Sequence, residues 1–379
     1  MNTEKLDRFI DLLPECGIPC ADFAISHEGK LVYRHMTGHA DNERTRLLSE
    51  RDLYYVFSVS KVTTCIAAMR LVEEGIIGLD DPVSKFLPSY ANLTVRQKDG
   101  SVKPAENVMT VRHLFTMTGG LDYDINSAPI IRARNIPGAN TVSILSALPE
   151  APLQFEPGTR YKYSLCHDVL AAVVEVASGE RFSEYVRKNI TEPLGMLDTT
   201  YHPSEAQKSR LVDMRRFVHG LMRSEPVDAE KHISHYVIND AYDSGGAGLC
   251  TSVNDQMKLL TVLANGGSTP DGYRILSQKS IEMMGEGGLP DSARPDFQPS
   301  RLYGYSWGLC GRAHVNPIHS CARSSVGEFG WDGAAGAFAL VDPTKRVAMY
   351  FGMEVLGCNY SYHHVFPKLR DMGFELLGY

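Results

Sequence analysis

A serine and a lysine three residues apart, Ser58 and Lys61, are the side chains of this sequence best spaced to do chemistry. Residues at i and i+3 share a helix face, so the lysine amine could reach the serine oxygen and take its proton. A serine hydroxyl is a weak nucleophile until such a base lies beside it, and a neutral amine can act as that base. The spacing predicts acyl transfer through Ser58, although a chain of this length is expected to contain about one Ser-x-x-Lys by chance.

The residues after Ser58 predict a buried helix. Apolar side chains cover most of the turn over 62–72, and Glu-Glu-Gly at 73–75 ends the run. A helix that is apolar nearly all round is buried, and the amides of its first turn favour negative charge. An oxyanion formed at Ser58 would be stabilised there. The alternative is that Ser58 only caps the helix and Lys61 is a solvated surface charge.

Two later segments could complete such a site. Tyr163 follows a turn at 156–159, and a tyrosine presented from a loop can exchange protons when a cation such as Lys61 lies near it. Segment 327–336 is dominated by glycine and alanine, which let backbone amides approach a ligand and act as oxyanion donors. Each has a structural alternative: Tyr163 could pack its ring and bond a backbone group, and the glycines could serve an edge-strand bulge.

Elements that could position these residues lie in a simple order along the chain. Strand-like sequence occurs at both ends, and helices separated by Pro- and Gly-rich loops occupy the middle. We expect an α+β fold in which helices flank an antiparallel sheet built from both termini, with the active site at the interface with an inserted, mostly helical subdomain. The expected domains are 1–80 with 241–379, and 81–240. The expected strands are 21–26, 30–34, 305–310, 337–341 and 347–351, and the expected helices include 58–74, one starting at 110, 168–177, 182–190 and 364–377.

Composition limits the partners and the compartment. A formal net charge of −7 without a Lys/Arg run argues against nucleic-acid and anionic-membrane partners. Mixed charges at 1–8 and the lack of a long apolar run predict neither a signal peptide nor a membrane span. Eight cysteines without a Cys-x-x-Cys pair predict free thiols, so we expect a cytoplasmic protein. The thirteen histidines form no complete ligand set, and we expect no metal and no cofactor.

With the three chemical elements in order, the chain resembles the serine β-lactamase-like superfamily. This group includes class C β-lactamases, penicillin-binding proteins, D-amino-acid-specific peptidases and family VIII carboxylesterases. The resemblance implies that Ser58 is the acylated nucleophile, Lys61 its partner and Tyr163 the proton shuttle, with the main-chain N–H groups of Ser58 and Ala334 as the oxyanion hole. It covers nearly the whole chain and is supported by further segments at 79–83, 110–114, 192–196, 245–249 and 341–343.

Two departures from the family's motifs concern the substrate. Class C enzymes carry Tyr-x-Asn, but here Leu165 replaces the asparagine that would contact a substrate amide. β-Lactamases carry Lys-Thr-Gly, but here Trp331, Asp332 and Gly333 stand in that place, which resembles the esterase branch. We expect these four residues to contact substrate, with Leu165 and Trp331 as an apolar rim. The missing lysine and the added carboxylate of Asp332 predict weak binding of anionic substrates.

The sequence therefore predicts a serine hydrolase, with carboxylesterase activity on small neutral esters favoured. The alternatives are β-lactamase, D-amino-acid peptidase or amidase activity, or a penicillin-binding or sensor protein that is acylated without turnover. A scaffold without chemistry is disfavoured because Ser58, Lys61 and Tyr163 are all present. Ser306 lies in a Gly-x-Ser-x-Gly pattern but lacks the strand–turn–helix context of an α/β-hydrolase nucleophile, so we predict a strand residue. The oligomeric state and the natural ester or amide substrate are not specified by the sequence.

Overall fold

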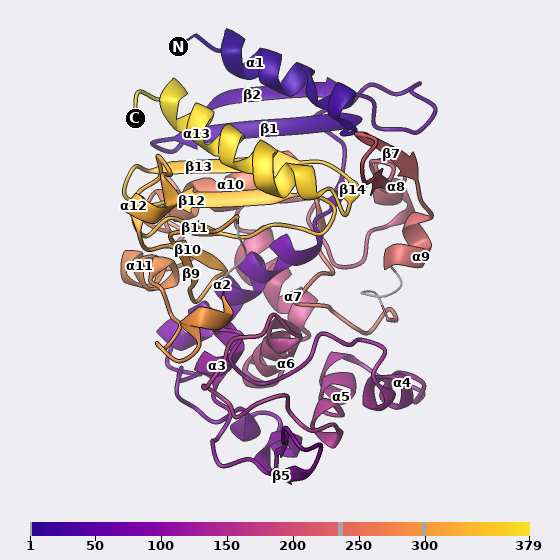
Figure 1. The fold of residues 1–379 in the computed structure, drawn as a ribbon, viewed down its shortest axis with the longest axis vertical. Helices are drawn as coiled ribbons and strands as arrows, with labels where there is room; N and C mark the ends of the chain where they lie inside the picture. Colours follow the sequence, from indigo (N-terminus) through magenta and orange to yellow (C-terminus); the bar gives the residue numbers. More distant parts are fainter. Residues whose placement is uncertain (1, 234–237, 298–300) are drawn as a thin grey trace.

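The computed structural model of the protein describes residues 2–233, 238–297 and 301–379. Its centre is a seven-stranded sheet built from both ends of the chain, with all neighbouring strands antiparallel (Figure 1). The order β2-β1-β13-β12-β11-β10-β9 puts the N-terminal hairpin at one edge. The strands are β1 (Cys20–His27), β2 (Lys30–Gly38), β9 (Tyr305–Trp307), β10 (Arg312–His314), β11 (Phe329–Gly330), β12 (Phe338–Asp342) and β13 (Val347–Gly352).

Both faces of the central strands are buried, and successive side chains alternate between two hydrophobic cores. In β12, Phe338 and Leu340 point to one core, and Ala339 and Val341 point to the other. Helices α1 (Glu4–Asp11) and α13 (Phe366–Leu376) cover the first face, while α10 (Val253–Ala264) covers the second (Figure 1). The continuous apolar run of such a strand follows from this two-sided cover.

Helix α2 (Ser60–Glu73) connects the sheet to the helical part of the molecule. It is apolar nearly all round and buried, as the sequence predicts, and it packs against α6 (Cys166–Ser178). One hydrophobic core extends from the sheet through both helices. The other helices are α3 (Val111–Phe115), α4 (Ala128–Arg134), α5 (Thr141–Leu145), α7 (Phe182–Val186), α8 (Glu205–Lys208), α9 (Ala229–Ile233), α11 (Gln278–Gly285) and α12 (Pro317–Ser320).

Three small sheets lie outside the central one. β3 (Tyr54–Tyr55) pairs with β8 (Cys250–Thr251) immediately before Ser58. β6 (Arg215–Val218) pairs with β7 (Arg223–Pro226) and also with β14 (Val355–Leu356), and β4 (Thr94–Arg96) pairs with β5 (Val102–Pro104). We did not predict these strands from the sequence, because runs of two to four residues carry almost no periodicity.

The expected fold class is confirmed, and most predicted elements are present with shifted ends. The N-terminal hairpin and the strands at 337–341 and 347–351 form as expected, and Thr110 begins α3 with a capping box. The strand expected at 305–310 ends at Trp307, and the α-helix expected to reach 190 ends at Val186 and continues as a π turn. The domain limits at 80 and 240 stay a prediction. Within the described ranges, no helix is long and apolar enough to cross a bilayer.

Candidate active site

Ser58 lies in a short 3₁₀ turn, Phe57–Val59, that leads directly into α2. The preceding Phe57 has φ of 44°, a left-handed conformation that is strained for an aromatic residue. The β3–β8 pairing holds the approach to this turn, since the Val56 N–H donates to the Leu249 carbonyl over 3.1 Å. Ser58 exposes only 9% of its surface. The hydroxyl is therefore fixed in the turn before the buried helix, two residues before its first α-helical residue, Ser60.

The Lys61 amine is completely buried beside this serine. Its Nζ lies 3.2 Å from Ser58 Oγ and donates a hydrogen bond of 2.6 Å to the Gly246 carbonyl. It also lies 4.7 Å from the centre of the Tyr163 ring. The i, i+3 contact expected from the sequence forms, and the alternative in which Lys61 is a solvated surface charge is wrong.

Tyr163 reaches the same place from the loop before α6. Its ring stacks on Tyr123, with centroids 5.4 Å apart, and its hydroxyl oxygen accepts a 3.0 Å hydrogen bond from the indole N–H of Trp331. A tyrosine hydroxyl is both donor and acceptor, so the indole bond leaves the phenol proton available to another acceptor. Tyr163 thus links the helix that carries Lys61 to the segment that carries Trp331.

The segment 331–334 packs directly against the residues before Ser58. A side-chain carbon added at Gly333 would collide with the Val56 carbonyl oxygen, so only glycine permits this close approach. The Gly333 N–H donates to the Ala337 carbonyl over 2.7 Å, and its own carbonyl accepts from the Tyr362 hydroxyl over 2.6 Å. The two segments expected to supply oxyanion donors, at Ser58 and Ala334, are therefore neighbours in space.

Asp332 does not present an unbalanced negative charge, contrary to the expectation from the sequence. Its carboxylate forms ion pairs with Arg312, at 3.1 Å, and with Arg301. Arg312 also pairs with Glu328 at 3.1 Å, and the guanidinium of Arg301 lies over the Trp331 ring. Because its charge is balanced inside the protein, Asp332 gives no reason by itself for the site to reject anionic substrates.

Two other predicted residues are placed clearly by the structure. Leu165 precedes the first turn of α6 and packs in the hydrophobic core with 2% of its surface exposed, so it adds almost nothing to an exposed rim. Ser306 lies in strand β9 opposite Ala313 of β10. The prediction that Ser306 is a strand residue, with no helix following it, is confirmed.

His167 lies beneath Lys61 but is not suited to act as a base. Burial first, and the nearby charge of Lys61 second, lower the pKa of this histidine to about 3. Its Nε2 is 3.1 Å from the Phe115 carbonyl, to which a neutral imidazole can donate. His167 is therefore a neutral core residue at physiological pH.

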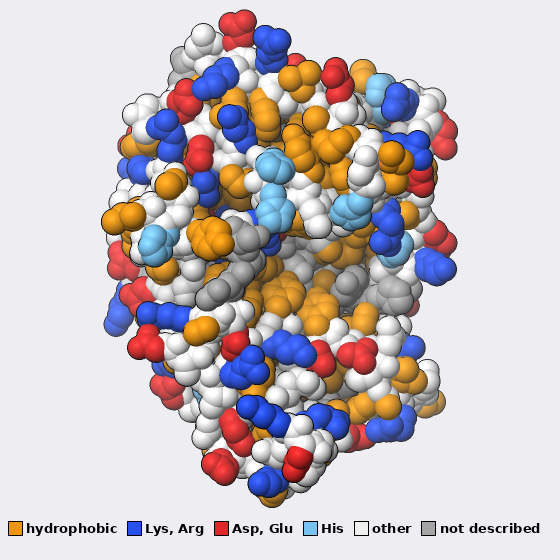
Figure 2. Space-filling model, viewed as in Figure 1, with side chains coloured by type: hydrophobic (Ala, Val, Ile, Leu, Met, Phe, Trp, Pro, Cys, Tyr) orange, Lys and Arg blue, Asp and Glu red, His pale blue; other side chains and the backbone are white. Residues whose placement is uncertain are grey.

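A pocket with a volume of about 760 Å³ opens beside the candidate site. Its apolar wall includes Tyr55, Met214 and Val227, which pack with Phe57 and Ala335, the neighbours of Ser58 and Ala334. Figure 2 shows the molecular surface hollowed between the sheet and the helical part, with hydrophobic side chains on the floor. Charged side chains such as Asp41, Arg46 and Lys208 also line this pocket, and Ser58 and Lys61 are not among its lining residues.

Several residues around Lys61 were not predicted from the sequence. Tyr123 stacks on Tyr163, and Lys61 Nζ lies 5.4 Å from its ring centre. Gly246 accepts from Lys61, and Asp168 accepts from the Gly246 N–H over 3.1 Å. The glycine-rich segment at 245–249 was the available signal for this contact, since glycines mark close backbone approach. Nothing in the local sequence distinguishes Tyr123.

Comparison with known proteins agrees with this geometry. The family model Beta-lactamase matches residues 6–353. Esterase EstB of Burkholderia gladioli is 29% identical over 362 residues, covering 89% of this chain and 86% of that protein. A putative D-alanyl-D-alanine carboxypeptidase of Escherichia coli is 23% identical over 374 residues, covering 92% and 82%. The solved structure of EstCE1, a hydrolase with promiscuous acyltransferase activity, superposes with a TM-score of 0.78 at 22% identity and 98% coverage of both chains.

The family match spans most of the chain, and the EstCE1 likeness extends the same fold over nearly all of it. Ser58, Lys61, Tyr163 and the segment 331–334 meet in the structure as the motif order predicts. The chain therefore belongs to the beta-lactamase family.

Proposed function

We propose that the protein is a serine esterase that forms an acyl-enzyme on Ser58. The observation that carries this proposal is the contact between Ser58 Oγ and the fully buried Lys61 amine, at 3.2 Å. An amine in that position can accept the serine proton as the oxygen attacks the ester carbonyl. The esterase name of the EstB relative supports an ester as the substrate.

In the proposed reaction, the Ser58 oxygen forms a bond to the ester carbonyl carbon while its proton passes to Lys61. The negative charge that develops on the carbonyl oxygen is stabilised by the main-chain N–H groups of Ser58 and Ala334. Tyr163 then gives its proton to the departing alcohol oxygen and is reprotonated from Lys61. Water hydrolyses the acyl-serine by the same steps in reverse, which releases the acid and restores Ser58.

The substrates that we propose are small neutral esters. The apolar part of the pocket next to Phe57 and Ala335 offers room for an uncharged acyl or alcohol group, although charged side chains line the rest of that pocket. Leu165 and Trp331 both pack in the core, with 2% and 7% of their surfaces exposed, so the second and third motifs add little exposed apolar surface. A cytoplasmic location remains a prediction from the sequence.

A second candidate is hydrolysis of an anionic peptide or β-lactam. It is favoured by the balanced charge of Asp332 and by Arg301, a partly exposed cation beside Trp331. The carboxypeptidase relative belongs to this substrate class by its name. The two candidates share Ser58 chemistry and differ only in what the cleft binds.

The test combines labelling with a substrate comparison. A fluorophosphonate should modify Ser58, located by peptide mass spectrometry, and Ser58→Ala should abolish both labelling and turnover. Ser306→Ala is the matched control and should keep both. For the substrate class, kcat/KM for a short-chain p-nitrophenyl ester should exceed that for a chromogenic cephalosporin at least about tenfold, or ~1.4 kcal/mol. Equal or faster cephalosporin turnover would favour the second candidate, and labelling of Ser306 alone would exclude both.

A further inference from the structure

The loop 242–249 contacts the candidate catalytic helix through its backbone. The Gly246 carbonyl accepts from Lys61 Nζ over 2.6 Å, and the Gly245 carbonyl accepts from the Thr64 hydroxyl over 2.7 Å. The loop is closed on the same helix by the Leu249 N–H, which donates to Ser60 Oγ over 3.0 Å. The position of the Lys61 amine therefore depends on the position of this loop.

On its other side the loop is held by Asp168, a buried carboxylate in the first turn of α6. Asp168 Oδ1 accepts from the Ser244 hydroxyl over 2.7 Å, from the Gly246 N–H over 3.1 Å and from the Tyr242 hydroxyl over 3.4 Å. A carboxylate is stabilised at a helix N-terminus by the partial positive charge there. A single fixed oxygen thus gathers three donors from the loop.

A continuous set of bonds connects this carboxylate to Lys61. Ser244 Oγ donates to Asp168 and accepts from the Ala247 N–H over 3.1 Å. That N–H belongs to the same rigid peptide unit as the Gly246 carbonyl, which accepts from Lys61. Fixing one end of a planar peptide fixes the direction of the carbonyl at the other end.

The loop has no room to shift toward α6. A side-chain carbon added at Gly246 would overlap the Asp168 carboxylate, and one at Gly245 would come within 2.6 Å of both Ala171 Cβ and the His167 carbonyl oxygen. Two adjacent glycines are what allow the backbone to lie against the carboxylate. This close packing explains the Gly-Gly pair of the motif at 245–249.

The direction of the Gly246 carbonyl matters for the chemistry. A neutral amine has two N–H bonds and one lone pair, so a carbonyl that holds one N–H restricts where the lone pair points. With that bond in place, the lone pair can be turned toward the Ser58 hydroxyl, 3.2 Å away. Small misplacements of a reacting group cost about 10²-fold in rate.

We propose that Asp168 is a positioning residue for the Lys61 amine, acting through Ser244 and the peptide between Gly246 and Ala247. The proposal rests on the proposed function, in which Lys61 takes the proton of Ser58. Asp168 itself lies one loop away from the reacting atoms.

The test uses Asp168→Ala and Asp168→Asn, with Asp255→Ala as the matched control. Asp255 is also a buried first-turn carboxylate, on α10, where it accepts from the Asp198 N–H and the Thr199 hydroxyl without contact to Lys61. Asp168→Ala should lower kcat for a p-nitrophenyl ester about 100-fold and leave KM within about twofold. Asp168→Asn, which keeps an accepting oxygen, should recover about tenfold of that loss. The Ser58 labelling rate should fall in parallel, while Asp255→Ala keeps kcat.

A double variant separates positioning from a general loss of structure. If Asp168 acts through Lys61, adding Asp168→Asn to Lys61→Ala should lower kcat by less than about twofold. An independent tenfold loss in that background would overturn the proposal, as would a wild-type kcat in Asp168→Asn. If Asp168→Ala does not fold, Ser244→Ala takes its place and should lower kcat about tenfold, with full activity counting against the proposal. Absence of Ser58 labelling in the wild-type protein would instead refute the proposed function.

Discussion

Two buried basic side chains near the candidate site, Lys61 and Arg312, have opposite kinds of partners. Among the described residues, the hydrogen-bond partners of Lys61 are a hydroxyl and a carbonyl, at Ser58 and Gly246. Arg312 is held by the carboxylates of Asp332 and Glu328. Both are almost completely buried, so burial does not distinguish them.

The difference shows which buried base can do chemistry. A guanidinium between two carboxylates is compensated and fixed, and removing it leaves buried charges unpaired. An amine held by uncharged oxygens has no fixed counterion and can exchange a proton with the hydroxyl beside it. Groups of the second kind are typical of active sites, whereas ion-pair networks are often structural. The predictions below test this contrast between Lys61, whose partners are uncharged, and Arg312, which is held by ion pairs.

The largest expected effect comes from changing Lys61 and its neighbour Tyr163. Lys61→Ala and Tyr163→Phe should each lower the rate of Ser58 acylation about 10²–10⁴-fold, the usual range for positioned acid–base groups. Because the two act on the same proton, the double variant should lose much less than the product of the single losses. Pre-steady-state release of p-nitrophenol measures acylation directly. Full activity in either single variant would show that the base lies elsewhere.

The next effect concerns the ion pairs of Arg312. Arg312→Met should lower the free energy of unfolding by about 3 kcal/mol, because it leaves the buried Glu328 carboxylate without its cation and leaves Asp332 paired with Arg301 alone. Lys61→Met is the matched control, because it removes an equally buried base without leaving a carboxylate unpaired. It should abolish activity and lower the free energy of unfolding by less than about 1 kcal/mol. Urea unfolding followed by fluorescence measures both. Equal losses of stability in the two variants would mean that Arg312 and Lys61 do not differ in the way their partners suggest.

These contrasts also mark the limit of what the sequence could predict. The Ser58–Lys61 contact follows from the i, i+3 spacing, because the 3₁₀ turn that carries Ser58 continues directly into the buried helix that carries Lys61. The sheet from both termini follows from the short strand-like apolar runs at the two ends of the chain, which the structure confirms in β1, β2, β12 and β13. Local periodicity was enough in both cases.

The partners of the polar and charged groups in the site were harder to predict, because they come from distant segments. Asp332 is neutralised by Arg312, which is 20 positions earlier and reaches it only because β10 pairs with β11. The link from Asp168 to Gly246 spans 78 positions, and the Trp331–Tyr163 bond spans 168. A sequence shows that such groups exist, but their pairing depends on tertiary packing that the local pattern does not reveal.

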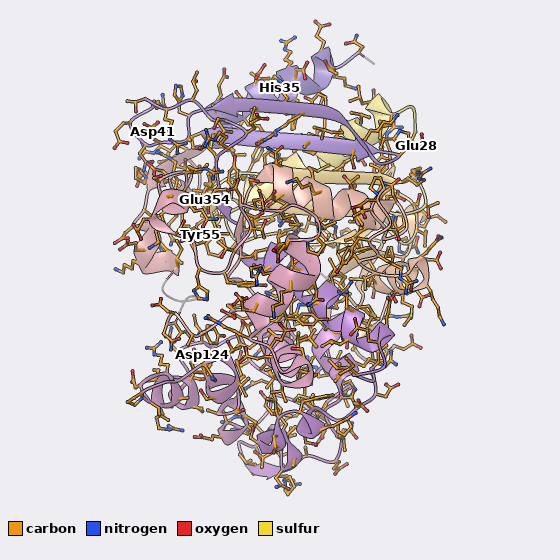
Figure 3. The ribbon with its side chains drawn as sticks, turned by 180° about the vertical axis from the view of Figure 1, so that it is seen from behind. Glu28, His35, Asp41, Tyr55, Asp124 and Glu354 are labelled. Atoms are coloured by element: carbon orange, nitrogen blue, oxygen red, sulfur yellow. The ribbon has the colours of Figure 1, made fainter. Side chains whose placement is uncertain are left out.

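Glu354 is a buried acid for which the described part of the chain supplies no ion-pair partner, and it sharpens the comparison further. Glu354 lies beside Tyr55, as Figure 3 shows, and its Oε2 accepts from the Tyr55 N–H over 3.1 Å. Its other oxygen has no hydrogen-bond partner among the residues that the structure describes. Burial raises the pKa of this carboxyl well above its ordinary range. We therefore expect Glu354 to be protonated in the folded protein. The carboxylates of Asp332 and Glu328, in contrast, are paired with Arg312.

The smallest predicted effect follows from the sign of that shift. A raised folded-state pKa means that the contribution to stability is complete below the ordinary glutamate pKa, about 4.3, and is lost as pH rises toward the folded value. Glu354→Gln cannot ionise, so its stability relative to wild type should improve steadily from pH 5 to pH 8 in urea unfolding. Glu375→Gln is the control with the opposite sign, because the hydrogen bond from Lys5 lowers the pKa of the Glu375 carboxyl. Its relative stability should be lowest at neutral pH and recover only as the pH falls into the range where Glu375 is protonated. A relative stability of Glu354→Gln that does not change with pH would mean that Glu354 is ionised in the folded protein, and that it has found compensation which its contacts in the structure do not supply.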